Sequence, residues 1–212
     1  MKYERKTVPV TFAALLLVSI ILILSGCSSS KSPTASPSST PITLPTASPS
    51  SGNVLVTSTD GIVSLSVPSG WNTNDTSLYP GAIIGVANDA NSEYVIVSQR
   101  AQYEIGTNSS VSDYLAVVKK VFSAILSNPV WGQTSSVTIG GCKGLAVQVS
   151  GTRTRDNANL VYFVNALANT KTNYYYNVCG WTVSNMADTN KTSIENIINS
   201  FKVTWPPKPT TP

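Results

Sequence analysis

The chain has 212 residues and carries 14 Lys and Arg residues against 10 Asp and Glu, a formal net charge of +4 at pH 7. The charges are few and form no basic cluster, which argues against nucleic-acid binding because phosphate-driven affinity needs a concentrated basic surface. The sequence contains no His, which excludes Ser-His-Asp and Cys-His catalysis and the usual His-containing zinc sites.

The first residues of the chain have the pattern of an export signal. Lys2, Arg5 and Lys6 precede residues 8–24, an uncharged and largely apolar run, as expected for a signal peptide whose basic end stays inside the cell. The run contains Pro9 and is shorter than the roughly 20 residues of a membrane-spanning helix. An uncleaved transmembrane anchor is therefore kept only as an alternative.

The apolar run ends in Leu24, Ser25, Gly26 and Cys27, which together resemble the lipobox of bacterial prolipoproteins. The resemblance implies that residues 1–26 are a signal peptide, that the Cys27 thiol is diacylated, and that the chain is cut just before it. Acylated Cys27 would attach the protein to the extracytoplasmic face of the cell membrane, since two or three acyl chains suffice for stable anchoring. Plain secretion without a lipid is a further alternative.

Residues 27–52 are predicted to form a tether. Of the 25 residues from 28 to 52, 19 are Ser, Thr or Pro, and the heptamer Pro-Thr-Ala-Ser-Pro-Ser-Ser occurs twice, at 33–39 and 45–51. Such a segment has little apolar surface to bury and cannot offset the entropy lost on ordering. In a polyproline conformation it would reach roughly 75 Å and hold a domain away from the membrane.

Residues 53–205 are long enough for one domain with its own hydrophobic core, and a disordered tail over 206–212 is expected to follow. Alternating apolar and polar residues between turn residues predict antiparallel strands with short connections. The strands are expected over 62–67, 82–87, 94–101, 133–139, 143–152, 158–167 and 173–181. Gly140 and Gly141 form one of the predicted turns.

Helical spacing of apolar residues predicts two helices, over 114–125 and 189–200. Ser110 or Ser112 can cap the first helix, and the pair Asn128-Pro129 is expected to end it.

The strand over 158–167 is apolar on both faces. One face carries Leu160, Tyr162, Val164 and Ala166, and the other carries Val161, Phe163 and Leu167. Because such a strand has to be covered on both sides, we expect one predicted helix on each face of the sheet.

Three segments of the chain carry a resemblance to a known family. They are 63–71 (Val-Ser-Leu-Ser-Val-Pro-Ser-Gly-Trp), 137–141 (Val-Thr-Ile-Gly-Gly) and 197–201 (Ile-Ile-Asn-Ser-Phe). Their order and spacing are similar to those of PsbP-like and Mog1-like domains. The resemblance implies an α+β fold, a three-layer α/β/α sandwich around a central antiparallel sheet. Members of this family are mainly binding or assembly proteins, so it implies a non-catalytic module.

No residue spacing points to a catalytic or metal site, and no cofactor is expected. Glu93 and Glu104 could pair as acid and base, but nothing in their spacing requires it. Asp60, Asp75 and Asp89 lie in turn-rich segments without EF-hand spacing, so weak calcium binding through loop oxygens stays open.

Two cysteines follow Cys27, and a disulfide between Cys142 and Cys179 or two buried thiols are both open. If the strand over 158–167 lies between them in space, their Cα atoms are about 9.5 Å apart, beyond disulfide reach. The absence of a Cys-x-x-Cys motif argues against a redox role.

Five residues are candidates for a recognition surface. Trp71, Tyr79 and Trp131 would stack on sugar rings if they line one groove, although burial in the core also explains aromatic residues here. Arg153 and Arg155 lie at a predicted hairpin tip, where they could meet an anionic partner.

The favoured interpretation is a membrane-anchored, extracytoplasmic binding or assembly module whose partner is an unidentified envelope protein or glycan. One alternative is a cell-wall or glycan-binding module. The other is a His-free hydrolase, which requires a cleft with converging carboxylates.

Overall fold

The computed structural model describes residues 52–204 except 76 and 107. The predictions for residues 1–26, for Cys27 and its lipobox, for nearly all of the tether and for 206–212 therefore lie outside the described residues. No helix in the described part is long and apolar enough to cross a membrane.

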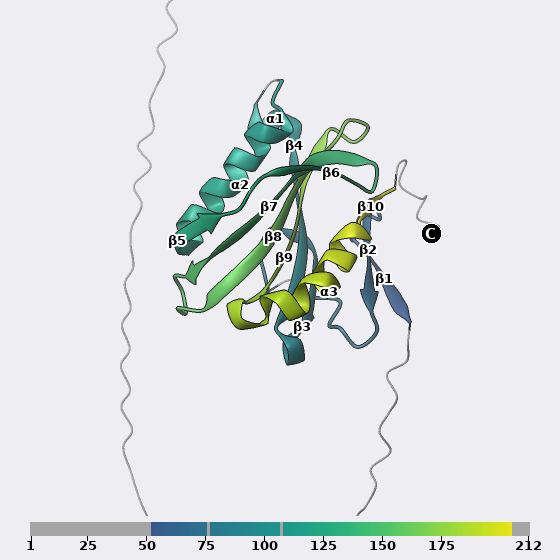
Figure 1. Ribbon diagram of the computed structural model, residues 1–212. Coiled ribbons are helices and arrows are strands. Elements are labelled where there is room, and N and C mark those ends of the chain that lie inside the picture. The colour runs from purple at the N-terminus through teal and green to yellow at the C-terminus, as the bar shows by residue number, and fades with distance from the viewer. Residues whose placement is uncertain (1–51, 76, 107, 205–212) are drawn as a thin grey trace, which may run out of the picture. The chain divides into compact units, whose positions relative to one another are not determined.

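Seven antiparallel strands form the main sheet (Figure 1). They are β3 (Ala82–Asn88), β4 (Glu93–Ala101), β5 (Leu126–Trp131), β6 (Ser135–Ile139), β7 (Cys142–Arg153), β8 (Asn159–Asn169) and β9 (Tyr174–Val183). Their order is β3-β4-β9-β8-β7-β5, and β6 also pairs with β7. Gly140 and Gly141, both with positive φ, form the predicted turn between β6 and β7. The predicted α+β fold around an antiparallel sheet is confirmed.

The first predicted strand, β2 (Val63–Pro68), belongs to a separate small sheet, between β1 (Asn53–Thr57) and β10 (Lys202–Val203). The apolar residues that alternate along β2 are buried, as predicted. The sequence does not predict β1 or β10, because β1 leaves Leu55 exposed and β10 has only two residues.

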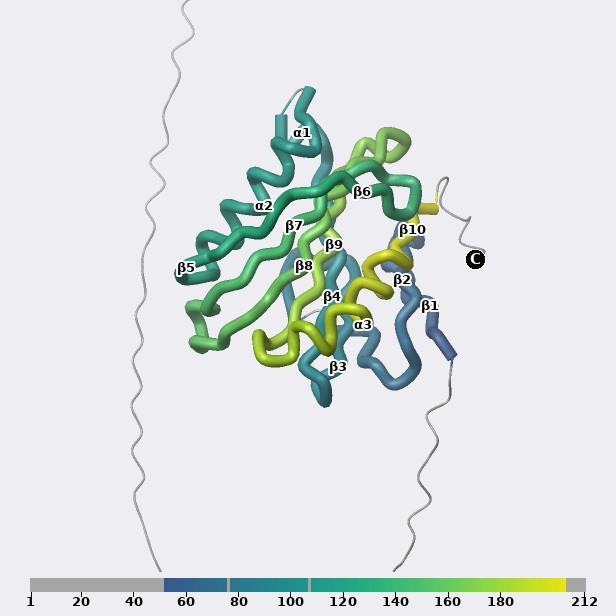
Figure 2. Tube along the Cα trace, in the orientation of Figure 1, coloured from purple at the N-terminus to yellow at the C-terminus, as the bar shows by residue number. Residues whose placement is uncertain are grey.

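Helix α2 (Val111–Ile125) covers one face of the main sheet, and helix α3 (Ala187–Asn199) covers the other beside the small sheet (Figures 1 and 2). Three short helical turns are α1 (Gln102–Ile105), η1 (Asp89–Asn91) and η2 (Ser184–Met186). Ser110 caps α2: its side chain accepts a hydrogen bond from the Asp113 amide, and the Asp113 carboxylate accepts one from the Ser110 amide. This reciprocal pair satisfies two amides that the helix leaves free.

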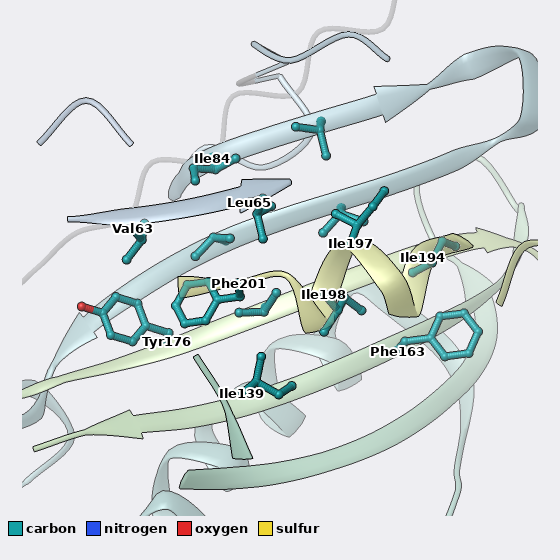
Figure 3. Close-up of a cluster of buried hydrophobic side chains, with 14 of the residues drawn as sticks. Val63, Leu65, Ile84, Ile139, Phe163, Tyr176, Ile194, Ile197, Ile198 and Phe201 are labelled. Atoms are coloured by element: carbon teal, nitrogen blue, oxygen red, sulfur yellow. The ribbon is translucent and has the colours of Figure 1, made fainter. Parts of the chain in front are cut away.

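The main sheet separates two hydrophobic cores. The α3-side core contains Val161, Phe163 and Leu167 of β8 together with Ile194, Ile197, Ile198 and Phe201 (Figure 3). The α2-side core contains Leu160, Tyr162, Val164 and Ala166 of β8 together with Tyr114, Leu115, Val118 and Phe122. The prediction that each face of this strand is covered by its own helix is confirmed.

The first helix ends at Ile125, as predicted, but the pair Asn128-Pro129 lies within the strand that follows and not at the helix end. Helix α2 ends at Ile125, and the chain continues directly into β5, which pairs with the end of β7. The register shifts between Ser127 and Val130, and Asn128 has a φ of 51°. Such an irregularity accommodates a proline, which has no amide proton for the ladder.

Tyr162 lies within the α2-side core. Its ring is 4.9 Å from that of Phe122 in an edge-on arrangement and 5.8 Å from that of Trp181. Burial raises the pKa of Tyr162 to about 12, and the positive charges of Arg153 and Arg155 oppose this shift. The hydroxyl is therefore neutral over the physiological range.

Substitutions at Gly180 of β9 and Ile194 of α3 test how closely α3 packs on the main sheet. A Cβ at this position would collide with Cγ2 of Ile194, so we expect Gly180→Ala to lower the free energy of unfolding by about 1–3 kcal/mol. Ile194→Ala alone should cost about 2–5 kcal/mol. In the double variant the collision is gone, so urea unfolding should show a cost below the sum of the single changes. Simple additivity would contradict the packing.

The raised pKa of Tyr162 should make the free energy of unfolding depend on pH. Its pKa is raised in the folded chain above the ordinary value of about 10. The unfolded chain therefore loses this proton first, and stability falls as the pH rises from about 10 to about 12, by up to about 1.4 kcal/mol per pH unit. Tyr162→Phe should show a shallower fall in urea unfolding across this range. If Tyr162→Phe loses stability with pH as steeply as the wild type, the Tyr162 hydroxyl is not the cause of the fall.

Candidate functional site

A cleft of about 590 Å³ opens on the α2 side of the main sheet, within the range of small-molecule sites. It forms because α2 packs mainly on β5, β7 and β8 and leaves much of β4 and β9 without a covering helix. Residues 78–81, just before β3, form part of the opposite wall. This site is termed the α2 cleft.

One wall of the α2 cleft is an apolar row on the helix. Val117, Val121 and Ile125 line the cleft and are 37%, 41% and 38% exposed, respectively. Their four-residue spacing places them in line along one side of α2. From Tyr114 to Ile125 the helix rises about 16 Å, which gives the length of this wall. The apolar face of α2 is thus wider than the strip that the core buries.

The floor of the α2 cleft consists of side chains from neighbouring strands. β4 contributes Ile96 and Ser98, β9 contributes Asn177 and Trp181, and β8 contributes Tyr162. Alternation along each strand turns these side chains toward α2, and Ile96, Tyr162 and Trp181 belong to the α2-side core. The floor is therefore apolar and aromatic except around the paired positions Ser98 and Asn177.

The Asn177 side chain presents an unused hydrogen-bond acceptor. Its Oδ1 is buried and has no hydrogen-bond partner among the described residues. A buried polar atom without a partner costs about 1–3 kcal/mol. A hydroxyl or N–H group on a bound molecule would satisfy it. Gln99 also lines the cleft, and its Oε1 atom is likewise buried and unpaired, but alternation along β4 turns that side chain toward the opposite face.

Arginines lie at one end of the α2 cleft, where the β7–β8 hairpin turns. The Arg153 Nε and Nη2 atoms donate to the Asp156 carboxylate at 2.9 and 2.6 Å. The Arg155 Nε lies 3.5 Å from the same carboxylate, and its side chain is 68% exposed. The hydrogen bonds from Arg153 are the largest cause that lowers the pKa of Asp156, to about 2. Two guanidinium groups thus share one carboxylate, so these three side chains carry one net positive charge.

The other end of the α2 cleft lies at the start of α2. Arg100 lines the cleft there and is paired with Glu104 at 3.2 Å. Tyr114 stacks on Tyr175 with ring centres 4.9 Å apart, and burial raises the pKa of Tyr114. This end therefore offers the neutral hydroxyl of Tyr114 and a guanidinium that already has a carboxylate partner.

The structure brings together three of the five predicted recognition residues: Tyr79, Arg153 and Arg155 line the α2 cleft. Trp131 packs edge-on against Phe122, with the Lys119 Nζ atom 5.0 Å from its ring centre. Trp71 packs against the α3-side core, on the opposite face of the sheet. The three aromatic residues therefore do not line one groove.

Neither Asn177 nor the partly exposed apolar row of α2 was predicted from the sequence as part of a site. A signal for Asn177 did exist, because it is a polar residue within an otherwise apolar strand between Tyr176 and Val178.

The disulfide alternative is contradicted, because Cys142 and Cys179 are both free and buried. Cys142 lies in the α3-side core and Cys179 in the α2-side core, with β8 between their strands. The Asn169 amide donates to the Cys142 Sγ atom at 3.3 Å. Burial raises the pKa of both thiols.

The carboxylates considered in the sequence lie apart from one another. The buried Glu93 carboxylate accepts a hydrogen bond from Asn88 at 2.7 Å, whereas Glu104 is tied to Arg100. Across the described ranges, no three His, Cys, Asp or Glu side chains form a group that could hold a metal ion. Nor does any carboxylate from these ranges line the α2 cleft.

Comparison with known proteins defines the fold. No protein-family model matches the sequence, and no curated protein matches it. Cyanobacterial PsbP from Synechocystis sp. PCC 6803 is similar in structure at 15% identity, with a TM-score of 0.52 over 73% of this chain and 94% of that one. The Ran-binding protein Mog1p of Saccharomyces cerevisiae is similar at 12% identity, with a TM-score of 0.50 over 73% of this chain and 96% of its own. The described domain therefore has a PsbP-like and Mog1-like fold.

Proposed function

We propose that the protein is a lipid-anchored, extracytoplasmic binding module without catalytic activity, and that its ligand occupies the α2 cleft. The observation that carries this proposal is the cleft itself. It combines exposed apolar side chains on α2, an aromatic floor and a buried amide oxygen without a partner. Apolar walls with a few placed polar groups are typical of small-molecule sites.

The chemistry of the α2 cleft supports binding rather than catalysis. The Tyr114 and Tyr162 hydroxyls have raised pKa values because they are buried, so they are poor bases near neutral pH. The Cys179 thiol at the floor has a raised pKa for the same reason, which disfavours the nucleophilic thiolate. Catalysis at such a site would need a group whose pKa is lowered toward neutral pH. The pKa values of Tyr114, Tyr162 and Cys179 are raised instead.

The anchoring part of the proposal rests on the sequence. The lipobox-like residues 24–27 follow a signal-like apolar run, and a tether rich in Ser, Thr and Pro precedes the folded domain. A tether of this composition can extend roughly 75 Å. The module would therefore sample a wide volume near the membrane and bind ligands or partners there.

Lipidation is tested by growing producing cells with a labelled fatty acid. We expect the wild-type chain to carry the label and Cys27→Ala to lose it, because the thiol is the acylated group. Cys142→Ala is the matched control and should keep the label. Label retained on Cys27→Ala would refute the anchoring proposal.

Ligand binding in the α2 cleft is tested with the neutral apolar dye N-phenylnaphthylamine, using the unlipidated Cys27→Ala chain as background. Val121→Arg places a charge in the apolar wall and should weaken dye binding at least about tenfold, since burying an unpaired charge is costly. Leu55→Arg is the control, because Leu55 is 67% exposed on β1, outside the cleft lining. Equal dye fluorescence from the two variants, with unfolding curves unchanged, would count against the site.

A further inference from the structure

We infer that the α2 cleft takes a linear anionic amphiphile, with its carboxylate or phosphate group at Arg153 and Arg155 and its chain directed toward Asn177. This inference rests on the proposed function and names the chemical class of the ligand. Three features carry it: the length of the apolar wall, the uneven distribution of charge along the cleft, and the position of the unpaired amide.

The shape of the α2 cleft favours a linear apolar body. The row formed by Val117, Val121 and Ile125 runs along α2 and lines the cleft. The wall from Tyr114 to Ile125 is about 16 Å long. A chain of methylene groups can follow such a wall and bury its surface against the helix on one side and the strands on the other.

Charge distinguishes the two ends of the α2 cleft. At the hairpin end, the guanidinium groups of Arg153 and Arg155 share the single carboxylate of Asp156. At the other end, Arg100 and Glu104 form a one-to-one pair. The group of Arg153, Asp156 and Arg155 therefore carries one net positive charge, and guanidinium groups bind carboxylate and phosphate oxygens well.

Other charged groups also lie near this end of the floor. Asp75 and Asp89 act on the hydroxyl of Tyr94, the ring of which stacks on Trp181, but neither acid lines the cleft. Lys119 sits over Trp131 and, like these acids, does not line the cleft.

The position of Asn177 on the cleft floor indicates a polar group at the far end of the ligand. It lies four residues before Trp181 on β9, so about 13 Å of floor separates the two positions. Tyr162, which pairs with Trp181, marks the arginine end, because it lies beside Arg153. A ligand that reaches from Arg153 toward Asn177 would find an unpaired acceptor there. A hydroxyl or N–H group at the far end of its chain would donate to that oxygen.

The test compares ligands of one chain length that differ in the head group, by displacement of the dye from the Cys27→Ala chain. Laurate should bind at least about tenfold more tightly than lauryl alcohol, and laurylamine should bind most weakly, because only the anion gains charge-assisted hydrogen bonds. ω-Hydroxylaurate should bind more tightly than laurate, and Asn177→Leu should remove that difference.

Variants at the arginine end distinguish the contribution of charge to laurate affinity from the contribution of packing. Arg155→Gln should weaken laurate binding by about fivefold to tenfold and leave lauryl alcohol unaffected. Asp156→Asn should strengthen laurate binding, because it releases both guanidinium groups. Lys191→Gln is the control, because Lys191 lies on α3 outside the cleft lining and is also paired with a carboxylate, that of Glu195. We expect laurate affinity to stay within about twofold of the parent.

The outcomes separate this inference from the proposed function. If neither the dye nor any lauryl compound binds, the cleft is not a ligand site and both proposals fail. If laurate and lauryl alcohol bind equally, the ligand class is wrong and the binding site remains. Binding to phosphatidylglycerol vesicles, but not to phosphatidylcholine vesicles or monomeric laurate, would overturn the inference in favour of a membrane surface.

Discussion

The burial of β8 on both faces is the constraint on which the rest of the structure depends. Its two alternating sets of apolar side chains enter two different cores. Each core needs its own cover, which α2 and α3 supply from opposite sides of the sheet. The cover is unequal, because α3 is joined by the small sheet of β1, β2 and β10, whereas α2 stands largely alone on its face.

This inequality creates the α2 cleft. A single helix is narrower than a sheet of seven strands, so α2 leaves the floor over β4 and β9 partly open. The same geometry leaves Val117, Val121 and Ile125 partly exposed, although they are apolar. The hairpin after β7 then places Arg153 and Arg155 at one end of that row. The site is a consequence of how the core is covered.

Local patterns in the sequence were sufficient to predict much of the fold. The apolar alternation in β8, the Ser110 cap and the short turns each depend on neighbouring residues, so they can be read along the chain. β1, β10 and the bulge at Asn128-Pro129 depend on pairing with distant strands, so no local pattern shows them. The charged hairpin tip was recognised, but its position beside α2 depends on strand register. Asn177 acquires its importance only when Oδ1 is buried.

A ligand in the α2 cleft would contact the Val and Ile side chains of its wall and floor. The most direct measurement is a titration of the protein with laurate, followed by NMR of labelled Val and Ile methyl groups. We expect shifts at Val117, Val121, Ile125 and Ile96, with Val63 and Ile197 in the α3-side core unmoved. Shifts confined to the α3 side, or no shifts at concentrations that saturate dye displacement, would contradict binding in the α2 cleft.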